Sequence, residues 1–338
     1  MKRSTHAWIA IRAIALLEEQ NVSPGLVNLL KPFASQASIG AWIPDINEAC
    51  RSGFLTMNHV FQNLPYNGYN KSRFKCSKSK LVDRLVGCPA IKEYLNQDKL
   101  LGSDWWNTPY KAEAKPGQHI PNRIMGLATM LEDLIPLGND DIACQMGKPC
   151  KALADMDKKA KTSPLQLAYY FFMMSHYIAD ACMPCHCDGR DNVSRTGDGT
   201  DLHTGMEKAW EKTLSSEFKD KNLLGMKTKA DKLLTKSRDM DLNHSLQFKL
   251  TIKKLRDGRD AWLEGVDSCR AFFAMASIIA PYTKYPYDFT KNSKKVLFTE
   301  IFPKSKEEEF KKVSGVILHD AVYNTAMIWN HVWQKAST

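Results

Sequence analysis

The stretch His176-Tyr-Ile-Ala-Asp180-Ala-Cys-Met-Pro184-Cys-His186 lies near the middle of the chain and follows an apolar run over residues 165–174. On a helix, His176 and Asp180 are four positions apart and share one face. Pro184 predicts the end of that helix, because proline cannot continue the hydrogen-bond ladder. His186 then follows just past the break. The stretch therefore predicts a buried helix that carries a metal-chelating pair, with a further histidine beside it.

A second pair of the same kind follows a polar loop, where His203 and Glu207 are again four positions apart. Imidazole nitrogens and carboxylate oxygens are zinc ligands, and this spacing lets one helix supply two of them. Together with the first stretch this makes five ligands, more than one four-coordinate site needs. We therefore expect at least two metal ions, with Asp180 able to bridge them. Asp45 and His59 would complete such a cluster.

The rest of the chain shows helical periodicity, and no stretch alternates like a strand. We expect an all-α fold, with one multi-helix domain over residues 1–338. Ser163-Pro164 and Asp201 are typical starts for the two ligand-bearing helices, and Ser23-Pro24 for another. The other helices are predicted at His6–Gln20, Pro24–Ser35, Trp42–Arg51, Leu81–Leu101, Pro121–Ile135, Asn243–Tyr282 and Lys304–Trp333.

The composition is that of an ordinary globular protein, with 43% hydrophobic residues and a net charge of +10. Such a charge is compatible with a basic surface that has no partner. It is equally compatible with a surface that attracts an anionic lipid surface or nucleic acid. The basic residues do not form one stripe. They also do not alternate with aromatic residues as in a single-strand-binding groove.

The N-terminal sequence MKRSTHAWIAIRAIALLEE predicts an amphipathic helix and not a cleaved signal peptide, because Arg12 interrupts the apolar run and no small-residue cleavage site follows. No apolar run reaches the roughly 18–20 residues of a membrane span. Nine cysteines leave at least one unpaired within a monomer. Three of them, Cys182, Cys185 and Cys187, surround His186. These cysteines are compatible with a loop beside the site, with a disulfide to Cys144 or Cys150, or with a separate thiolate metal site. The cysteine pattern therefore does not indicate in which cellular compartment the protein is found.

The motif His-Tyr-x-x-Asp-x-x-x-Pro-x-His, followed by His-x-x-x-Glu, resembles that of the zinc-dependent phospholipases C and the single-strand-specific zinc nucleases. An early His6, then Asp45 and His59, stand in the matching order. The resemblance implies an all-α phosphodiesterase with three zinc ions, two at minimum. It touches residues 1–207 and leaves residues 208–338 as helical scaffold. Relatives of this kind are usually secreted.

The resemblance also implies which residues bind each ion. One zinc would bind Asp45, His59, His176 and a bridging Asp180. A second zinc would bind His186, His203 and Glu207. A third would bind His6, Asp180 and the amine and carbonyl of residue 1. Asp45 would orient or deprotonate the attacking water. Met1 stands where the family has Trp, but its spacing to His6 is that of the nuclease branch, so we expect the Met1 amine to bind the third zinc. Ala179 replaces the usual Gly without removing a ligand.

The two branches of the resembling family act on different substrates. Glu207, where Asp is the alternative, and Tyr177 after the first His favour the phospholipase branch, which releases diacylglycerol and a phosphorylated head group at a membrane surface. The alternative is a nuclease that acts on single-stranded nucleic acid and releases 5′-phosphates. A non-catalytic helical binding protein is a further alternative. No obligate protein partner is indicated.

Overall fold

The computed structural model describes residues 1–50, 120–138, 162–183, 186, 202–218, 230–240 and 298–337. Within these ranges every regular element is helical, so the predicted all-α class is confirmed for this part of the chain. The elements are α1 (Arg3–Glu19), α2 (Pro24–Leu30), η1 (Lys31–Gln36), α3 (Ala37–Gly40), α4 (Ile43–Cys50), α7 (Ile120–Gly138), α10 (Pro164–Ala181), α12 (Leu202–Phe218), α14 (Ala230–Asp239), α16 (Phe298–Ile301), η6 (Lys304–Lys306) and α17 (Glu307–Ser337).

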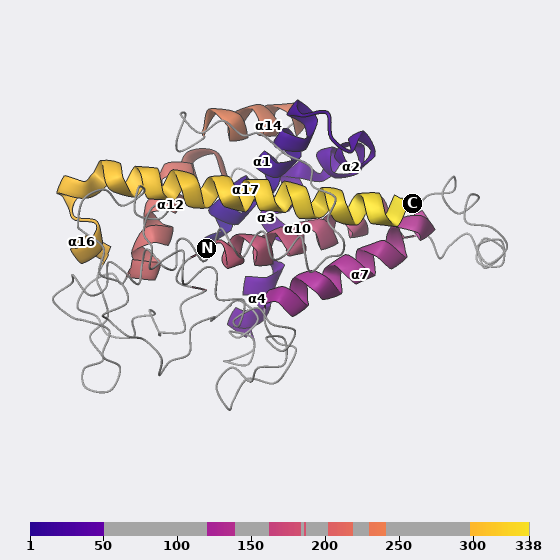
Figure 1. Cartoon of the computed structure of the whole chain (residues 1–338), viewed down its shortest axis with the longest axis horizontal. Helices are drawn as coiled ribbons and strands as arrows, with labels where there is room; N and C mark the ends of the chain where they lie inside the picture. The colour runs from indigo at the N-terminus through magenta and orange to yellow at the C-terminus, as the bar shows by residue number, and fades with distance from the viewer. Residues whose placement is uncertain are drawn as a thin grey trace, which may run out of the picture.

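Helix α1 lies at the centre of the described structure, where it contacts α3, α10, α12, α14 and α17 (Figure 1). Every residue from Ser4 to Leu17 is buried. The prediction of an amphipathic helix was therefore wrong, because a helix that is covered on all sides needs no polar face. The buried Arg12 is compensated by Glu19, whose Oε1 lies 3.0 Å from its Nη1.

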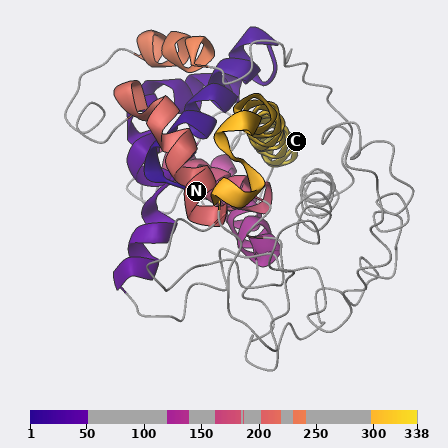
Figure 2. The ribbon, with the colours of Figure 1, turned by 90° about the vertical axis from the view of Figure 1, so that its left-hand side faces the viewer.

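Helix α10 packs between α7 and the long α17, which Figure 2 views along its axis. The contact with α17 is aromatic: the Phe171 and Phe172 rings lie 5.8 and 6.2 Å from the Trp329 ring. The start of α10 follows the prediction, since Ser163 Oγ accepts a hydrogen bond from the Gln166 N–H at 3.1 Å. This N-cap stabilises the start of α10, at the end of the helix opposite to His176 and Asp180.

The segment after α1 differs from the prediction. Ser23 does not cap α2; its backbone is left-handed, with φ at 45°, and its Oγ lies 2.5 Å from Asn330 Oδ1 on α17. The single helix expected to reach Ser35 is divided into α2 and the 3₁₀ helix η1. Pro32 explains the change, since it has no N–H for the α-helical ladder.

Two glycines allow helices to approach closely beside the ligand-bearing segments. A Cβ at Gly40 would lie 2.7 Å from Phe172 Cβ, and a Cβ at Gly205 would clash with Phe298 Cβ. Gly40 therefore lets α3 rest on α10, and Gly205 lets α16 rest on α12. Any larger residue would push these elements apart.

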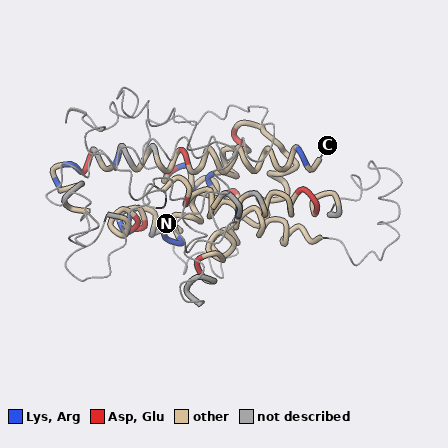
Figure 3. Tube along the Cα trace, turned by 60° about the horizontal axis from the view of Figure 1, so that its bottom comes forward, with Lys and Arg blue, Asp and Glu red and all other residues tan. Residues whose placement is uncertain are grey.

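Charged residues are scattered over the described helices and do not gather in one stripe (Figure 3). Among the described helices none is both long and apolar enough to cross a membrane. Helix α14 was not predicted. The helices predicted at Leu81–Leu101 and Asn243–Tyr282 lie outside the described residues.

Candidate metal centre

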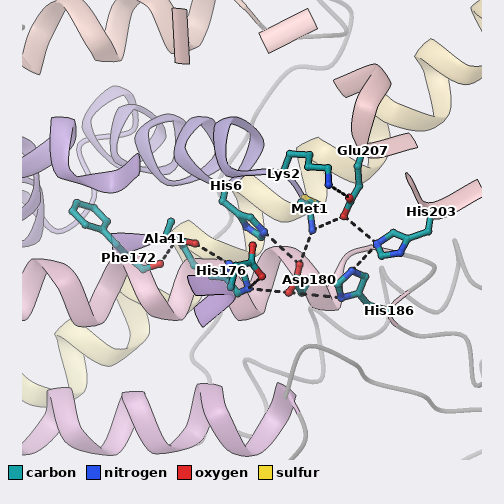
Figure 4. A network of polar contacts seen from close by, with 12 residues as sticks. Met1, Lys2, His6, Ala41, Phe172, His176, Asp180, His186, His203 and Glu207 are labelled. Atoms are coloured by element: carbon teal, nitrogen blue, oxygen red, sulfur yellow. Dashed lines mark hydrogen bonds and ion pairs between the residues drawn. The ribbon is translucent and has the colours of Figure 1, made fainter. Parts of the chain in front are cut away.

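Five segments bring their polar side chains to one place (Figure 4). The start of the chain and α1 supply Met1 and His6, α4 supplies Asp45, and the end of α10 supplies His176 and Asp180. His186 follows α10, and α12 carries His203 and Glu207. The cluster thus joins elements far apart in the sequence.

The first group consists of His6, Asp45 and His176, whose ligand atoms all lie within 4.8 Å of one another. The His6 and His176 rings are stacked with centroids 4.0 Å apart. His176 Nε2 lies 3.6 Å from Asp45 Oδ1. Both rings are buried, whereas the Asp45 side chain keeps 27% of its surface exposed. Asp45 is therefore the part of this group that meets solvent.

The second group consists of His186, His203 and Glu207, again with ligand atoms within 4.8 Å of one another. The two Nε2 atoms of His186 and His203 are 3.0 Å apart, and His203 Nε2 lies 3.0 Å from Glu207 Oε1. The predicted chelating pair on α12 is therefore present as a contact. The His203 side chain is 18% exposed and the Glu207 side chain 9%.

Asp180 lies between the two groups. Its Oδ2 is 3.0 Å from His176 Nε2 and 3.7 Å from His186 Nδ1, and its Oδ1 is 3.5 Å from His6 Nε2. One carboxylate thus faces histidines of both groups. This is the arrangement that a bridging ligand requires.

The α-amine of Met1 lies beside the same carboxylate. It is 3.2 Å from Asp180 Oδ1 and 2.9 Å from Glu207 Oε1, and it is fully buried. The amine therefore sits between the two groups as an inward-facing nitrogen.

A backbone carbonyl fixes the orientation of His176. Its Nδ1 lies 2.7 Å from the Ala41 carbonyl oxygen. A carbonyl only accepts, so Nδ1 carries a proton and donates it, which leaves Nε2 directed at Asp45 and Asp180. A histidine held at one nitrogen by a backbone carbonyl is the usual arrangement for a metal ligand.

His6 provides the clearest sign that the site fits a metal. Its ring is 1% exposed, and within the described residues neither ring nitrogen has a hydrogen-bond partner. Burying an imidazole in this way costs free energy unless its lone pair binds something. The surrounding donors are imidazole nitrogens and carboxylate oxygens, which zinc accepts. The residues present therefore fit a zinc-like divalent ion.

The charges of the cluster stabilise one another without a metal. Burial lowers the pKa of the Met1 amine, but Asp180, Glu207 and Asp45 outweigh it and raise the pKa to about 11. Burial would raise the pKa of Asp180, yet His186, the amine and His176 hold it well below its usual value. Burial would likewise raise the pKa of Glu207, but the amine and His203 hold it well below its usual value. The carboxylates are thus ionised and available as ligands.

Two of the histidines are held neutral. Burial, the neighbouring His176 and the amine bring the pKa of His6 well below its ordinary value. Burial, the amine and His203 lower the pKa of His186 to about 3, although Asp180 acts in the opposite direction. Burial also acts on His176, but Asp180 and Asp45 prevail and raise its pKa. His6 and His186 therefore offer lone pairs at neutral pH without losing a proton first.

The grouping differs in one respect from the set implied by the resemblance. His6 lies with Asp45 and His176, as well as beside Asp180, whose Oδ1 also contacts the Met1 amine. His59 lies outside the described residues. The division of these residues among individual ions therefore stays a prediction, whereas the presence of two adjacent groups that could hold metal is a property of the structure.

Two contributors were not predicted from the sequence. The Ala41 carbonyl has no sequence signal, because any residue supplies one. Lys2 places its Nζ 3.5 Å from Glu207 Oε2. The sequence feature that could have predicted Lys2 is its position next to Met1, whose amine was expected in the site.

Cysteine plays no part in either described group. Cys182 is buried, and its sulfur accepts a hydrogen bond from Asn324 Nδ2 at 3.9 Å. Cys144, Cys150, Cys185 and Cys187, invoked for a disulfide or a thiolate site, lie outside the described residues.

Comparison with protein-family models, with curated proteins and with solved structures finds no match. The functional reading therefore rests on the residues of the cluster and on the motif they form.

Proposed function

We propose that this protein is a zinc-dependent phosphodiesterase that cleaves phospholipid into diacylglycerol and a phosphorylated head group. The observation that carries the proposal is the pair of adjacent histidine and carboxylate groups joined by Asp180. When bound there, zinc supplies positive charge that offsets the negative charge of the diester and lowers the pKa of water beside it.

The chain's own residues hold and orient the reactants. Asp45 is the most exposed member of the first group, which supports it as the carboxylate that would orient the attacking water and accept its proton. His176 cannot serve as that base from Nδ1, because Nδ1 is committed to the Ala41 carbonyl. Its role is to keep Nε2 directed into the site.

The phospholipid assignment follows the Glu207 and Tyr177 positions of the motif. A second candidate is a single-strand-specific nuclease. It is favoured by the Met1 amine, which stands at the nuclease spacing from His6 and lies 3.2 Å from Asp180. Both candidates need the same cluster and the same chemistry at phosphorus, and they differ in what flanks the phosphate.

A metal assay comes first. The purified protein should retain zinc after dialysis, and a protein that binds no zinc would rule out both enzyme candidates together. Emulsified phosphatidylcholine and single-stranded DNA are then incubated separately with the protein, with and without chelator. Chelator-sensitive release of diacylglycerol supports the first candidate, and release of nucleotide 5′-phosphates supports the second.

Variants at the site connect the activity to the cluster. His186→Ala removes a ligand candidate of the second group and should abolish the chelator-sensitive activity. Its matched control is His319→Ala, because His319 lies on α17, contacts Asp320 and Tyr323 and belongs to neither ligand group. Full activity in His186→Ala would refute the assignment of the site.

A further inference from the structure

Lys2 stands at the accessible edge of the cluster. Its side chain is 42% exposed, whereas the Glu207 side chain that it approaches is 9% exposed. The Met1 amine and the Asp180 carboxylate beyond it are buried. Figure 4 shows the Lys2 ammonium above Met1, directed toward Glu207. An anion that enters from this side therefore meets Lys2 before the buried members of the cluster.

The backbone of Lys2 is held on both sides. Its carbonyl accepts hydrogen bonds from the N–H groups of Thr5 and His6 at 3.0 and 3.1 Å. Before it, Met1 is buried against Asp180; after it, Arg3 donates from Nε to the Ser38 carbonyl at 2.8 Å. Only the side chain of Lys2 is left to move, and its length lets the ammonium reach across the edge of the site.

The pairing with Glu207 is loose. The separation of 3.5 Å between Nζ and Oε2 is that of an ion pair without a close hydrogen bond. Glu207 Oε1 is already committed to the Met1 amine and His203, at 2.9 and 3.0 Å. An ammonium has three donors, and one carboxylate oxygen at this distance does not occupy them.

We propose that Lys2 is a substrate-binding residue that donates to a non-bridging phosphoryl oxygen at the edge of the cluster. This inference rests on the proposed phosphodiesterase function and deepens it, because it names the group of this chain that holds the anionic part of the substrate. A flexible ammonium is suited to this role as a point charge that adapts to differently flanked phosphates. The phosphoryl group is shared by lipid head groups and nucleic acids.

The test uses zinc-loaded full-length protein freed of excess metal, with inorganic phosphate as the probe in a calorimetric titration. Lys2→Gln should bind phosphate about tenfold more weakly, the effect of one lost charge-assisted hydrogen bond. Lys2→Arg should retain most of the affinity. Lys208→Gln is the matched control: Lys208 is exposed on α12 beside Glu207 in sequence, and its loss changes net charge equally. Mass spectrometry checks that Met1 is retained in each variant.

Zinc content separates binding of the anion from support of the metal. It should be unchanged in Lys2→Gln. If Lys2→Gln binds phosphate as tightly as wild type, or if it loses zinc as Glu207→Gln does, the inference is overturned. A zinc-loaded wild-type protein that binds no phosphate overturns it as well.

Kinetics then tie the residue to substrate. KM for a short-chain phospholipid and for single-stranded DNA should rise in Lys2→Gln on whichever substrate is cleaved, with kcat changed less. If neither is cleaved, the proposed function fails, and the phosphate titration still decides the role of Lys2.

Discussion

Asp180 is the residue that contacts histidines of both groups. It contacts His176, His186, His6 and the Met1 amine within 3.0–3.7 Å. We predict that Asp180→Asn lowers zinc affinity by roughly 100-fold or more at both groups, because the shared anionic oxygen is lost. Glu207→Gln should affect one group only. Zinc stoichiometry after dialysis against a graded chelator distinguishes the two variants. Full stoichiometry in Asp180→Asn would show that Asp180 bridges nothing.

The pKa shifts predict how the zinc-free protein depends on pH. The pKa of His186 is depressed to about 3, so the unfolded chain binds a proton that the folded chain does not, and the free energy of unfolding falls as pH drops below about 6.5. The pKa of the Met1 amine is raised to about 11. Its contribution is therefore complete below about pH 8 and is lost as pH rises toward 11.

Stability should consequently be greatest between about pH 6.5 and 8. Urea unfolding in excess chelator at acidic, neutral and alkaline pH measures this. The fall on each side should exceed about 1 kcal/mol, the value of a one-unit difference in pKa. In His186→Gln the acid-side fall should shrink. An equal acid-side fall in that variant would mean that other groups cause it.

Sequence reasoning could predict contacts between residues on one helix. His176 with Asp180, and His203 with Glu207, follow from a spacing of one turn and are close in the structure. The stacking of His6 on His176 could not be derived in this way, because the two residues lie on different helices whose packing depends on the whole core. The motif resemblance brought His6 to the site, but it did not predict that His6 lies with Asp45 and His176.

At the scale of elements, the close contact of α3 with α10 places the Ala41 carbonyl against His176. Gly40→Ala would bring a methyl group to 2.7 Å from Phe172 Cβ, so we predict a loss of about 1–3 kcal/mol in stability. Zinc affinity should fall with it, because Ala41 is carried away from His176. Gly126→Ala is the control, since nothing lies within 4 Å of that position and alanine favours the helix by up to about 1 kcal/mol. Denaturation and chelator competition measure the two effects.

Arg3 ties the start of α1 to the segment that carries Asp45. Its Nε donates to the Ser38 carbonyl at 2.8 Å, and its guanidinium lies 4.6 Å above the Trp42 ring. We predict that Arg3→Ala weakens zinc binding about tenfold, as expected for a residue that orients ligands without touching the metal. Chelator competition well below the unfolding temperature measures this effect apart from stability.

A control with the same chemistry exists at the other end of α1. Arg238 on α14 pairs with Glu18 and Glu19, so Arg238→Ala removes an arginine clamp that is remote from the cluster. It should lower stability by at most about 1 kcal/mol, as for other partly exposed ion pairs, and leave zinc affinity unchanged. Equal zinc affinities in Arg3→Ala and wild type would reduce Arg3 to a structural contact.

The elements that sequence reasoning missed share a physical cause. Helix α14 has the sequence ADKLLTKSRD, in which only Leu233 and Leu234 are deeply buried apolar residues. So short an apolar signal does not distinguish a helix from a loop, and the helix depends on its packing against α1. The prediction of an amphipathic α1 fails for a related reason. Helical periodicity in the sequence shows on which face apolar residues lie, but it does not show how many other helices will pack around that helix.

For the whole molecule, a metal held by the two groups would join α1, α4, α10 and α12, and the unfolded chain has no such site. Zinc should therefore raise the melting temperature, by an amount that corresponds to about 2.7 kcal/mol at a hundredfold excess over Kd. Differential scanning fluorimetry with zinc and with chelator measures the shift. Asp180→Asn should show little of it. Identical melting of zinc-loaded and chelated wild type would contradict a metal site that spans these helices.

The burial of α1 also orders events in time. The Ser23–Asn330 hydrogen bond spans 307 positions, and α17 covers the helix that carries His6. During synthesis, α1 leaves the ribosome long before α17 exists to cover it. The covering of α1 is therefore completed late, after α17 has been translated, and until then the apolar surface of α1 is open to aggregation.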